Sequence, residues 1–364
     1  EYLSNKKWNG RVYNGDGDII SELKNGTGKI KESLDNIILF EGEYLNGQRN
    51  GKGIEYFGNI ELVFEGEYLN GQRSGKGKEY YYDGKLEYEG EYLNGKRNGK
   101  GKEYYQNGKL MFKGEYLSDK KWNGIGYDGN GNIIYELKNG NGKMKEYNAY
   151  NFELMFEGKY LNGKRYGKGK EYYNDKLRYE GEYLNGERNG IGKKYHVFSG
   201  ELVFEGEYLD GKKDGTGKDY HEGKLVFEGK YLYDHKLKGK EYFNDILEYS
   251  GEYLYDKKYN GKGYDENGNI TYEIKNGNGK LKEFKSGCLI FEGEYLCGER
   301  HGNGKEYDFY HSKVFGGKYI NGRKWSGEGK EYYSNNIIKY EGEYKNGIKW
   351  NGKGYNYQGN LEFN

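Results

Sequence analysis

Proline is absent from the 364 residues, and no long apolar run occurs among them. Proline would break the backbone hydrogen bonds of a sheet, so its absence fits an uninterrupted ladder of β-strands. The 64 glycines would then supply the turns. Without 18 consecutive apolar residues we expect no membrane-spanning helix. The chain opens on Glu1-Tyr2-Leu3 without a basic and apolar leader, so we also expect no signal peptide.

An excess of charge of either sign is missing as well. The chain has 59 Lys and Arg against 58 Asp and Glu, a formal net charge of +1, although 32% of its residues are charged. A balanced chain has no bulk attraction for nucleic acid or for an anionic membrane. We therefore expect no nucleic-acid partner.

Cysteine is nearly absent. Cys288 and Cys297 are the two that occur. They belong to one expected strand, where nine residues span about 30 Å at ~3.3 Å per residue. That separation is too large for a disulfide between them. We therefore expect free thiols in a reducing compartment, which predicts a cytoplasmic protein.

Aliphatic side chains are scarce, and a composition so poor in them would ordinarily indicate disorder. Two features oppose that interpretation: the net charge is near zero, and 45 tyrosines bring the aromatic share to 18%. A thin repetitive sheet fits both observations. Each hairpin of such a sheet needs only its two neighbours, and rings stacked on glycines replace a deep core.

A unit of about 23 residues recurs through the chain, and residues 88–110, YEGEYLNGKRNGKGKEYYQNGKL, show it clearly. Its period of two from Leu86 to Leu93 predicts a strand with one aromatic face and one charged face. Asn94 to Asn98 supply a turn, and a second strand follows. The Gly-x-Tyr anchor of the unit recurs with Tyr44, Tyr68, Tyr92, Tyr116, Tyr160, Tyr183, Tyr208, Tyr231, Tyr253, Tyr295, Tyr319 and Tyr344.

The charges of the unit predict a register for the hairpin. If Tyr92 lies opposite Gly99, then Glu91 meets Lys100 and Glu89 meets Lys102. Opposite charges across an antiparallel pair contribute about 0.2–1 kcal/mol. One face then becomes a Glu/Lys ladder. The other becomes a groove of tyrosines and glycines, in which the glycines leave room for the rings.

Altered units interrupt the standard ones near residues 8–34, 122–147 and 259–284, and another begins at residue 350. They lack the anchor and carry a tight Asn-Gly, as at Asn25-Gly26, Asn139-Gly140 and Asn276-Gly277. Asn-Gly is a strong signal for a two-residue hairpin turn. We expect a change of curvature at each altered unit but no domain boundary. Residues 1–364 are predicted to be one continuous array and a piece of a longer chain.

The order Tyr-x-Gly-x-Tyr, Asn-Gly-Lys and Gly-x-Gly resembles the MORN repeat (membrane occupation and recognition nexus). The segment from Gly298 to Gly304 also carries the family's usual histidine, His301. Tyrosine replaces the family's usual tryptophan, and the altered units fit the pattern poorly. Lys-Glu-Tyr-Tyr followed by Asn-Gly-Lys-Leu is similar to the variant in bacterial antitoxin-type proteins. The resemblance implies an all-β, elongated, twisted single-layer antiparallel sheet of tandem hairpins. It also implies a scaffold or a dimerisation and targeting module at the cytoskeleton or the membrane periphery.

Residues that could carry catalysis do not cluster in the sequence. The histidines occupy different repeat positions, and most carboxylates belong to the ladder. The loop at Gly95 to Gly101 lacks the spacing and the Ser/Thr of a phosphate-binding loop. We therefore expect no enzyme, no metal site and no cofactor. The histidines are His196, His221, His235, His301 and His311.

The main functional hypothesis is a protein partner lying along the tyrosine groove, although the same rings could simply join the hairpins. A basic stripe on the turns could instead contact phosphoinositide head groups, unless nearby glutamates neutralise it. Two further alternatives are a structural spacer or homodimer that associates through the array ends, and a toxin-neutralising binder. The stripe would consist of Arg49, Arg73, Lys96, Arg97, Lys164 and Arg165.

Overall fold

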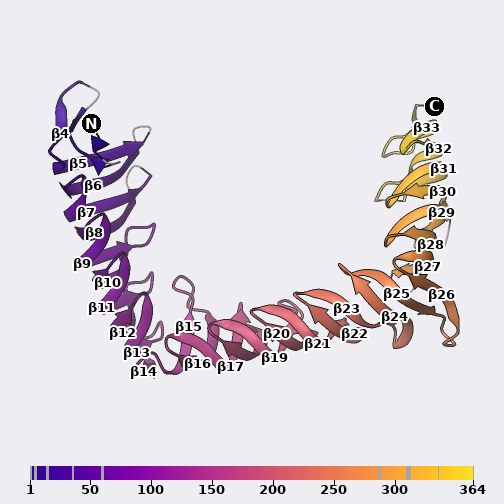
Figure 1. Cartoon of the computed structure of the whole chain (residues 1–364), viewed down its shortest axis with the longest axis horizontal. Coiled ribbons are helices and arrows are strands. Elements are labelled where there is room, and N and C mark those ends of the chain that lie inside the picture. The colour runs from indigo at the N-terminus through magenta and orange to yellow at the C-terminus, as the bar shows by residue number, and fades with distance from the viewer. Residues whose placement is uncertain are drawn as a thin grey trace. The chain divides into compact units, whose positions relative to one another are not determined.

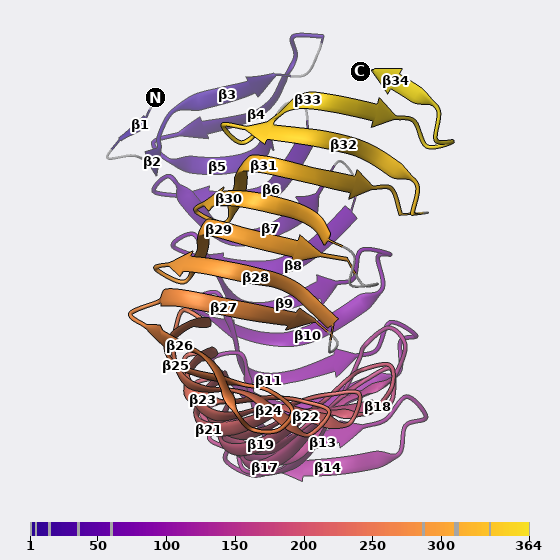
Figure 2. The same cartoon turned by 90° about the vertical axis from the view of Figure 1, so that its right-hand side faces the viewer.

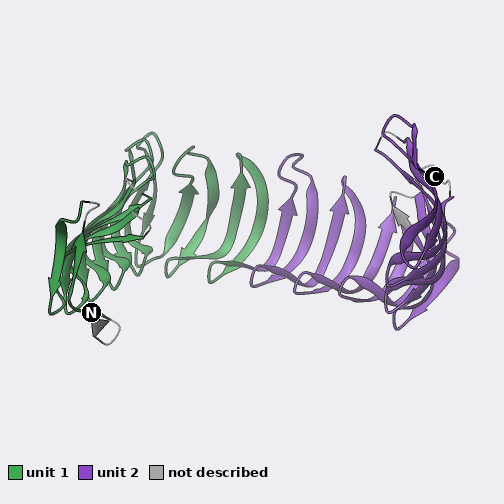
Figure 3. Cartoon of the chain, turned by 90° about the horizontal axis from the view of Figure 1, so that it is seen from above, with its two compact units in different colours: residues 1–187 green, residues 188–364 purple. Residues whose placement is uncertain are grey.

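The computed structural model describes residues 2–3, 6–13, 16–34, 37–58, 61–285, 288–308, 313–334 and 336–363. Strands make up 76% of the structure and run antiparallel, and the described residues contain no helix, so the predicted all-β fold class is confirmed. It follows that none of them forms a helix able to cross a membrane. The chain divides into two compact units, residues 1–187 and residues 188–364 (Figure 3).

Unit 1 contains a 12-stranded sheet in which successive strands pair in chain order, as the indigo and purple strands of Figure 1 show. The separate pair β1 (Tyr2–Leu3) and β2 (Lys6–Lys7) precedes it. The strands of the 12-stranded sheet are β3 (Gly10–Tyr13), β4 (Ile19–Lys24), β5 (Thr27–Leu34), β6 (Ile37–Leu45), β7 (Gln48–Phe57), β8 (Glu61–Leu69), β9 (Gln72–Tyr80), β10 (Leu86–Leu93), β11 (Lys96–Tyr104), β12 (Leu110–Leu117), β13 (Lys120–Tyr127) and β14 (Ile133–Leu137).

The altered unit at residues 122–147 ends this sheet. Strands β14 and β15 (Gly142–Tyr147) are joined across the turn by one isolated bridge, Lys138 to Asn141. Asn139 and Gly140 form the predicted tight turn. The φ angles of the three Asn-Gly turns of the altered units lie between 49 and 73°. A second sheet begins at β15 and continues in unit 1 through β16 (Leu154–Leu161), β17 (Lys164–Tyr173) and β18 (Lys176–Leu184).

Unit 2 repeats the same plan from β19 to β34, and Figure 2 shows β27 to β33 lying side by side in chain order. Its strands are β19 (Glu187–Tyr195), β20 (Leu202–Leu209), β21 (Lys212–His221), β22 (Lys224–Leu232), β23 (His235–Phe243), β24 (Ile246–Leu254), β25 (Lys257–Tyr264), β26 (Ile270–Lys275), β27 (Asn278–Lys285), β28 (Cys288–Leu296), β29 (Glu299–Tyr307), β30 (Lys313–Ile320), β31 (Arg323–Tyr332), β32 (Ile338–Lys345), β33 (Ile348–Tyr355) and β34 (Leu361–Phe363).

The predicted hairpin register is correct for one half of the hairpin and wrong for the other. In β10–β11, Glu89 pairs with Lys102 as predicted, and Gly90 pairs with Gly101. Tyr92, however, pairs with Arg97 and not with Gly99. The reason is the turn, because Asn94 and Gly95 at φ 52° and 80° close the hairpin with two residues. Residues 98–100 therefore bulge opposite Glu91. On the other side of β10, Tyr92 lies opposite Gly75 of the preceding hairpin.

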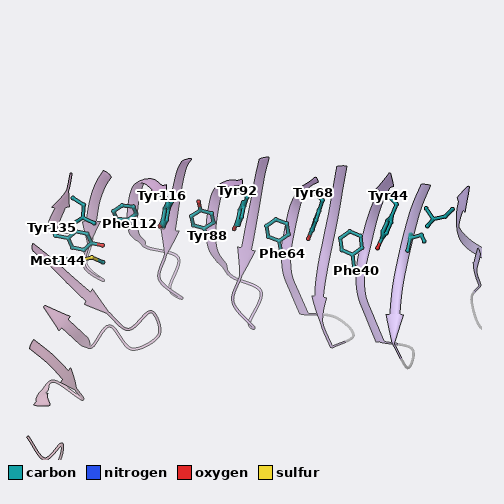
Figure 4. Packing of buried hydrophobic residues seen from close by; sticks show 13 residues of the cluster. Phe40, Tyr44, Phe64, Tyr68, Tyr88, Tyr92, Phe112, Tyr116, Tyr135 and Met144 are labelled. Carbon is teal, nitrogen blue, oxygen red and sulfur yellow. The ribbon is translucent and has the colours of Figure 1, made fainter. Parts of the chain in front are cut away.

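The core of unit 1 is mainly a row of aromatic rings on one face of the sheet, drawn in Figure 4, and Leu23, Ile30, Leu137 and Met144 belong to the same cluster. The ring of Phe64 lies edge-on to Tyr68 of its own strand at 5.6 Å and to Tyr92 of the next hairpin at 5.3 Å, centroid to centroid. The glycines make room for these rings, as predicted. A Cβ atom on Gly101 would lie 2.3 Å from the Tyr88 hydroxyl. Neighbouring hairpins are therefore joined by rings that interlock over glycine backbone.

Candidate functional site

A basic residue just after the turn lies over the aromatic ring of its own hairpin in most standard repeats. The guanidinium carbon of Arg49 is 3.9 Å from the centroid of the Phe40 ring, and that of Arg97 is 4.2 Å from the Tyr88 ring. This stacking covers the ring from solvent and holds the cation by its attraction to the ring face. Lysine takes the same place in several repeats of unit 2, where Lys213 lies 4.2 Å from the ring of Phe204, whereas Arg300 lies 4.2 Å from the ring of Phe291.

These cations and the glutamates of neighbouring repeats form a continuous ion-pair row from β5 to β13 in unit 1. Arg73 pairs with Glu55 at 2.5 Å and with Glu79 at 2.8 Å. The Tyr68 hydroxyl donates to Glu55 at 2.7 Å, so an anchor tyrosine joins the row. The row consists of Glu32, Arg49, Glu55, Arg73, Glu79, Arg97, Glu103 and Lys121.

Partial burial and these partners shift the pKa values of the row. Burial alone would raise the pKa of Glu32, but hydrogen bonds from Arg49, Lys7 and Tyr44 outweigh it and lower the pKa to about 2. Burial and the hydrogen bond to Glu32 raise the pKa of Tyr44 well above its ordinary value. The glutamate stays ionised and the tyrosine stays protonated at neutral pH. The row is therefore built for ion pairing and not for proton transfer.

The tyrosines of the predicted groove lie within this core. Ten of the twelve are buried, and Tyr160 and Tyr295 are half-buried. Four residues of the predicted basic stripe, Arg49, Arg73, Arg97 and Arg165, are half-buried in ion pairs with glutamates. Lys96 and Lys164 remain exposed beside their turns. The binding roles of the groove and of the stripe stay predictions.

The opposite face of the sheet, which we call the charged face, carries the predicted Glu/Lys ladder. Lys102 pairs with Glu89 at 2.7 Å, and the Tyr104 hydroxyl donates to the same carboxylate at 2.8 Å. The arrangement recurs at Glu65, which accepts from Lys78 at 3.0 Å and from Tyr80 at 2.6 Å. Glu65 and Glu89 therefore each accept from a lysine and a tyrosine on the neighbouring strand.

The glutamate inside the Gly-x-Tyr anchor has a role that the sequence interpretation missed. The carboxylate of Glu91 accepts from the backbone amide of Lys100 at 3.0 Å, within the bulge. Glu43 and Glu207 bind the equivalent amides of Lys52 and Thr216 at 3.1 and 2.9 Å. The available signal was a glycine eight residues after the glutamate. Gly99, at φ 98°, adopts a left-handed conformation that places the amide for this bond.

A groove of about 1100 Å³ follows the charged face from β7 to β13 in unit 1. Its floor includes the paired glycines of the strand centres, such as Gly90 with Gly101, where backbone lies open between the side chains. Its charged lining consists of Lys52, Lys76, Lys78, Lys100, Lys102 and Lys113 with Glu65, Glu67, Glu89, Glu91 and Glu115. The groove can receive an extended segment that makes both polar and backbone contacts.

The described histidines and cysteines do not gather into a metal site. Within the described ranges, no group of three His, Cys, Asp or Glu side chains could hold a metal ion. His196 and His235 contact Ser199 and Asp256 on exposed turns, whereas His311 lies outside the described residues. Both cysteine thiols are free, as predicted, with Cys297 on an exposed turn.

The MORN repeat model matches eight segments, residues 40–59, 64–85, 88–109, 156–178, 179–196, 204–218, 291–308 and 340–354. The chain is a MORN-repeat protein. Three of the altered units, near residues 8–34, 122–147 and 259–284, lie outside the matched segments. MORN repeats commonly mediate protein or membrane interactions, and the family is generally non-enzymatic. The similarity of this MORN protein to the antitoxin-type variant stays a prediction.

Comparison with curated proteins gives no match. Among solved structures, the crystal structure of TcdB2-TccC3-TEV is similar at 9% identity and a TM-score of 0.16, over 96% of this chain and 19% of that one. The crystal structure of TcdB2-TccC3 without its hypervariable C-terminal region gives 8% identity and a TM-score of 0.18, over 97% and 21%. The MORN protein thus spans about a fifth of those chains. Similarity at these scores carries no functional argument.

Proposed function

We propose that this MORN protein is a non-enzymatic scaffold that binds a segment of another protein in the groove of unit 1. The observation that carries the proposal is the groove itself, about 1100 Å³ on the charged face between β7 and β13. Solenoid-like repeat proteins characteristically bind partners along extended concave surfaces. An extended segment could lie across the strands and exchange hydrogen bonds with the ladder side chains.

The aromatic face is less accessible to such a partner. Its rings are covered by one another and by the basic residues after the turns, as Arg97 covers Tyr88. Tyr92 is 4% exposed. Replacing it by alanine would remove packing between hairpins, so a loss of binding in that variant would report on the fold. The charged face offers side chains that can be changed without opening the core.

The lowered pKa of Glu89 and the hydrogen bond that Glu91 accepts favour a binding role for the charged face over a catalytic one. Hydrogen bonds from Lys102 and Tyr104 lower the pKa of Glu89, although burial opposes them. Glu91 is occupied by the amide of Lys100. A general acid needs a pKa raised toward neutrality. Glu89 has the opposite shift, which supports a role in organising the surface.

Site-specific photo-crosslinking tests the proposal in the full chain. Lys78→p-benzoylphenylalanine places the photoreactive group in the groove. Lys193→p-benzoylphenylalanine is the matched control, because Lys193 pairs with Glu205 at 3.3 Å as Lys78 pairs with Glu65 at 3.0 Å, but it lies in unit 2. In native lysate we expect one protein to be crosslinked at residue 78 through one short peptide, and not at residue 193.

Light scattering on the same purified chain separates a partner from self-association. Equal crosslinking at both positions, or none at residue 78, contradicts the proposed groove. A crosslink from residue 78 to a second copy of this chain, together with a dimer mass, would replace the proposal by a homodimer. Crosslinking to lipid in place of protein would replace it by a membrane-binding role.

A further inference from the structure

One residue of the groove departs from the repeat. The position between the first ring and the anchor glycine is glutamate in nine copies: Glu41, Glu65, Glu89, Glu157, Glu180, Glu205, Glu228, Glu292 and Glu341. It is Ser250 and Gly316 in two others. In the copy that begins at Phe112 it is Lys113, the only basic residue at this position in the repeats that carry the anchor. Lys113 lines the groove.

The neighbours of Lys113 leave its charge uncompensated. It lies directly opposite Lys102 on β11 and Ile125 on β13. The usual glutamate would meet a lysine there, as Glu89 meets Lys78. Lys102 is already paired with Glu89 at 2.7 Å, and Lys113 forms no ion pair within the described part of the chain. Like charges directly opposite one another destabilise a sheet.

Two carboxylates nearby do not remove this positive charge. Glu115, on the same strand, accepts from the Asn123 side chain at 2.7 Å and lies opposite Lys100. Glu136 lies two strands from Lys113, opposite Ile125. Lys100, Lys102 and Lys113 lie together on β11 and β12 within the groove. Lys100 faces Glu115 and Lys102 is paired with Glu89, so Lys113, with Ile125 beside it, is the one of the three that has no carboxylate opposite it among the described residues.

We propose that this part of the groove binds an acidic side chain of the partner segment and that Lys113 is the residue that selects it. The inference rests on the proposed protein-binding groove and adds the chemistry of its occupant, an acidic peptide. A carboxylate placed between Lys102 and Lys113 would relieve their repulsion, and a neighbouring apolar side chain of the peptide would contact Ile125. Charge complementarity of this kind sets partner choice at repeat surfaces.

The test compares two charge reversals that both restore the usual glutamate of their repeat position. Lys113→Glu gives Lys102 the cross-strand glutamate found in other hairpins. Lys230→Glu is the matched control, because Lys230 also lies opposite a lysine, Lys238, but in unit 2 and outside the groove. Both variants relieve a like-charge pair, so we expect neither to lower the melting temperature.

The probe is a fluorescein-labelled peptide of ten glutamates, titrated with the full chain and followed by fluorescence anisotropy. We expect Lys113→Glu to weaken binding about fivefold to tenfold, since one attraction becomes a repulsion at a partly exposed site. We expect Lys230→Glu to change it less than twofold, and a ten-glutamine peptide not to bind. Unchanged binding in Lys113→Glu, equal weakening by both variants, or no binding of the acidic peptide overturns the inference.

A competition arm distinguishes a peptide from a membrane. Phosphatidylserine vesicles that displace the peptide from the parent chain but not from Lys113→Glu would overturn the peptide assignment in favour of lipid. Failure of this inference differs from failure of the proposed function. Suppose that the Lys113→Glu chain still crosslinks its protein partner at residue 78 with full yield. The groove then still binds protein, and only the claim that Lys113 selects an acidic segment is rejected.

Discussion

At the scale of single residues, the glutamate of the Gly-x-Tyr anchor shows how a charged side chain can be structural. Glu91 does not hold a lysine side chain. It accepts from the backbone amide of Lys100, which the bulge has removed from the ladder of sheet hydrogen bonds. A backbone amide without a partner is costly, so the carboxylate allows the two-residue turn and the bulge to coexist.

Removing this carboxylate should weaken the hairpin that it supports. Glu91→Ala should destabilise the hairpin β10–β11 by about 1–2 kcal/mol, because the amide of Lys100 loses its acceptor. Hydrogen exchange should show faster exchange of the Lys100 amide. Glu115→Ala is the control, since Glu115 binds the side chain of Asn123 and no backbone amide. If Glu115→Ala lost as much stability as Glu91→Ala, the hydrogen bond to the bulge amide would not be the cause of the loss.

The stability of the ion-pair row should depend on pH. The pKa of Glu32 is lowered to about 2 in the folded chain, from an ordinary value near 4.5. A folded-state pKa below the unfolded one stabilises the fold above the unfolded pKa, and this stabilisation is lost as pH falls from about 4.5 through about 2. Glu32→Gln lacks this contribution at every pH.

Urea unfolding at a series of pH values measures the effect. The free energy of unfolding of the parent chain should exceed that of Glu32→Gln at pH 7, and the difference should shrink as pH falls from about 4.5 to about 2. Two curves that stay parallel through this range would show that Glu32 is not held ionised by Arg49, Lys7 and Tyr44.

At the scale of elements, the strand centres are defined by paired glycines beneath aromatic rings. Gly101→Ala should lower the free energy of unfolding by about 1–3 kcal/mol, because the new Cβ atom would lie 2.3 Å from the Tyr88 hydroxyl and force the ring to move. The control is Gly10→Ala, where no atom lies within 4 Å of the added Cβ. Denaturation of the full chain measures both. Equal effects would mean that packing over Gly101 is not the cause.

Much of this element structure follows from the sequence, and the failures have physical reasons. The period of two from Leu86 to Leu93 and the Asn-Gly turns fix strands and turn positions, because local residues determine both. The predicted partner of Tyr92 was wrong because a bulge changes the register. The number of residues between two strands does not reveal which of them are left unpaired in a bulge. The same charge pattern that predicts the ladder at Glu89 and Lys102 cannot show that Glu91 leaves it for an amide.

The candidate site was less predictable than the fold for a related reason. Alternation places tyrosines and charges on opposite faces, but it does not tell which face remains open. That depends on Arg97 and its equivalents, whose side chains reach back over the rings although they lie beside the turn. Lys113 is visible in the sequence as a departure from the repeat. Its unpaired charge becomes evident only from the strand register, which places Lys113 opposite Lys102.

At the scale of the whole molecule, neighbouring hairpins are joined by the backbone pairing of adjacent strands, and in unit 1 side chains add two further connections, the interlocked rings and the ion-pair row. Arg97 belongs to both, since it stacks on Tyr88 and pairs with Glu79 and Glu103. Its side chain is 16% exposed. Removing one member of a poorly exposed ion pair leaves its partners uncompensated, at a cost of about 3–5 kcal/mol.

In a repeat array where each unit contacts only its neighbours, such a loss should remain local. We expect Arg97→Ala to accelerate hydrogen exchange in β9 to β12, which carry Glu79, Tyr88 and Glu103, and to leave unit 2 unchanged. Arg178→Ala, at an exposed position on β18, is the control and should leave β9 to β12 protected. Faster exchange throughout both units in Arg97→Ala would show instead that the chain unfolds as one cooperative body. In that case stability could not be assigned to neighbouring hairpins.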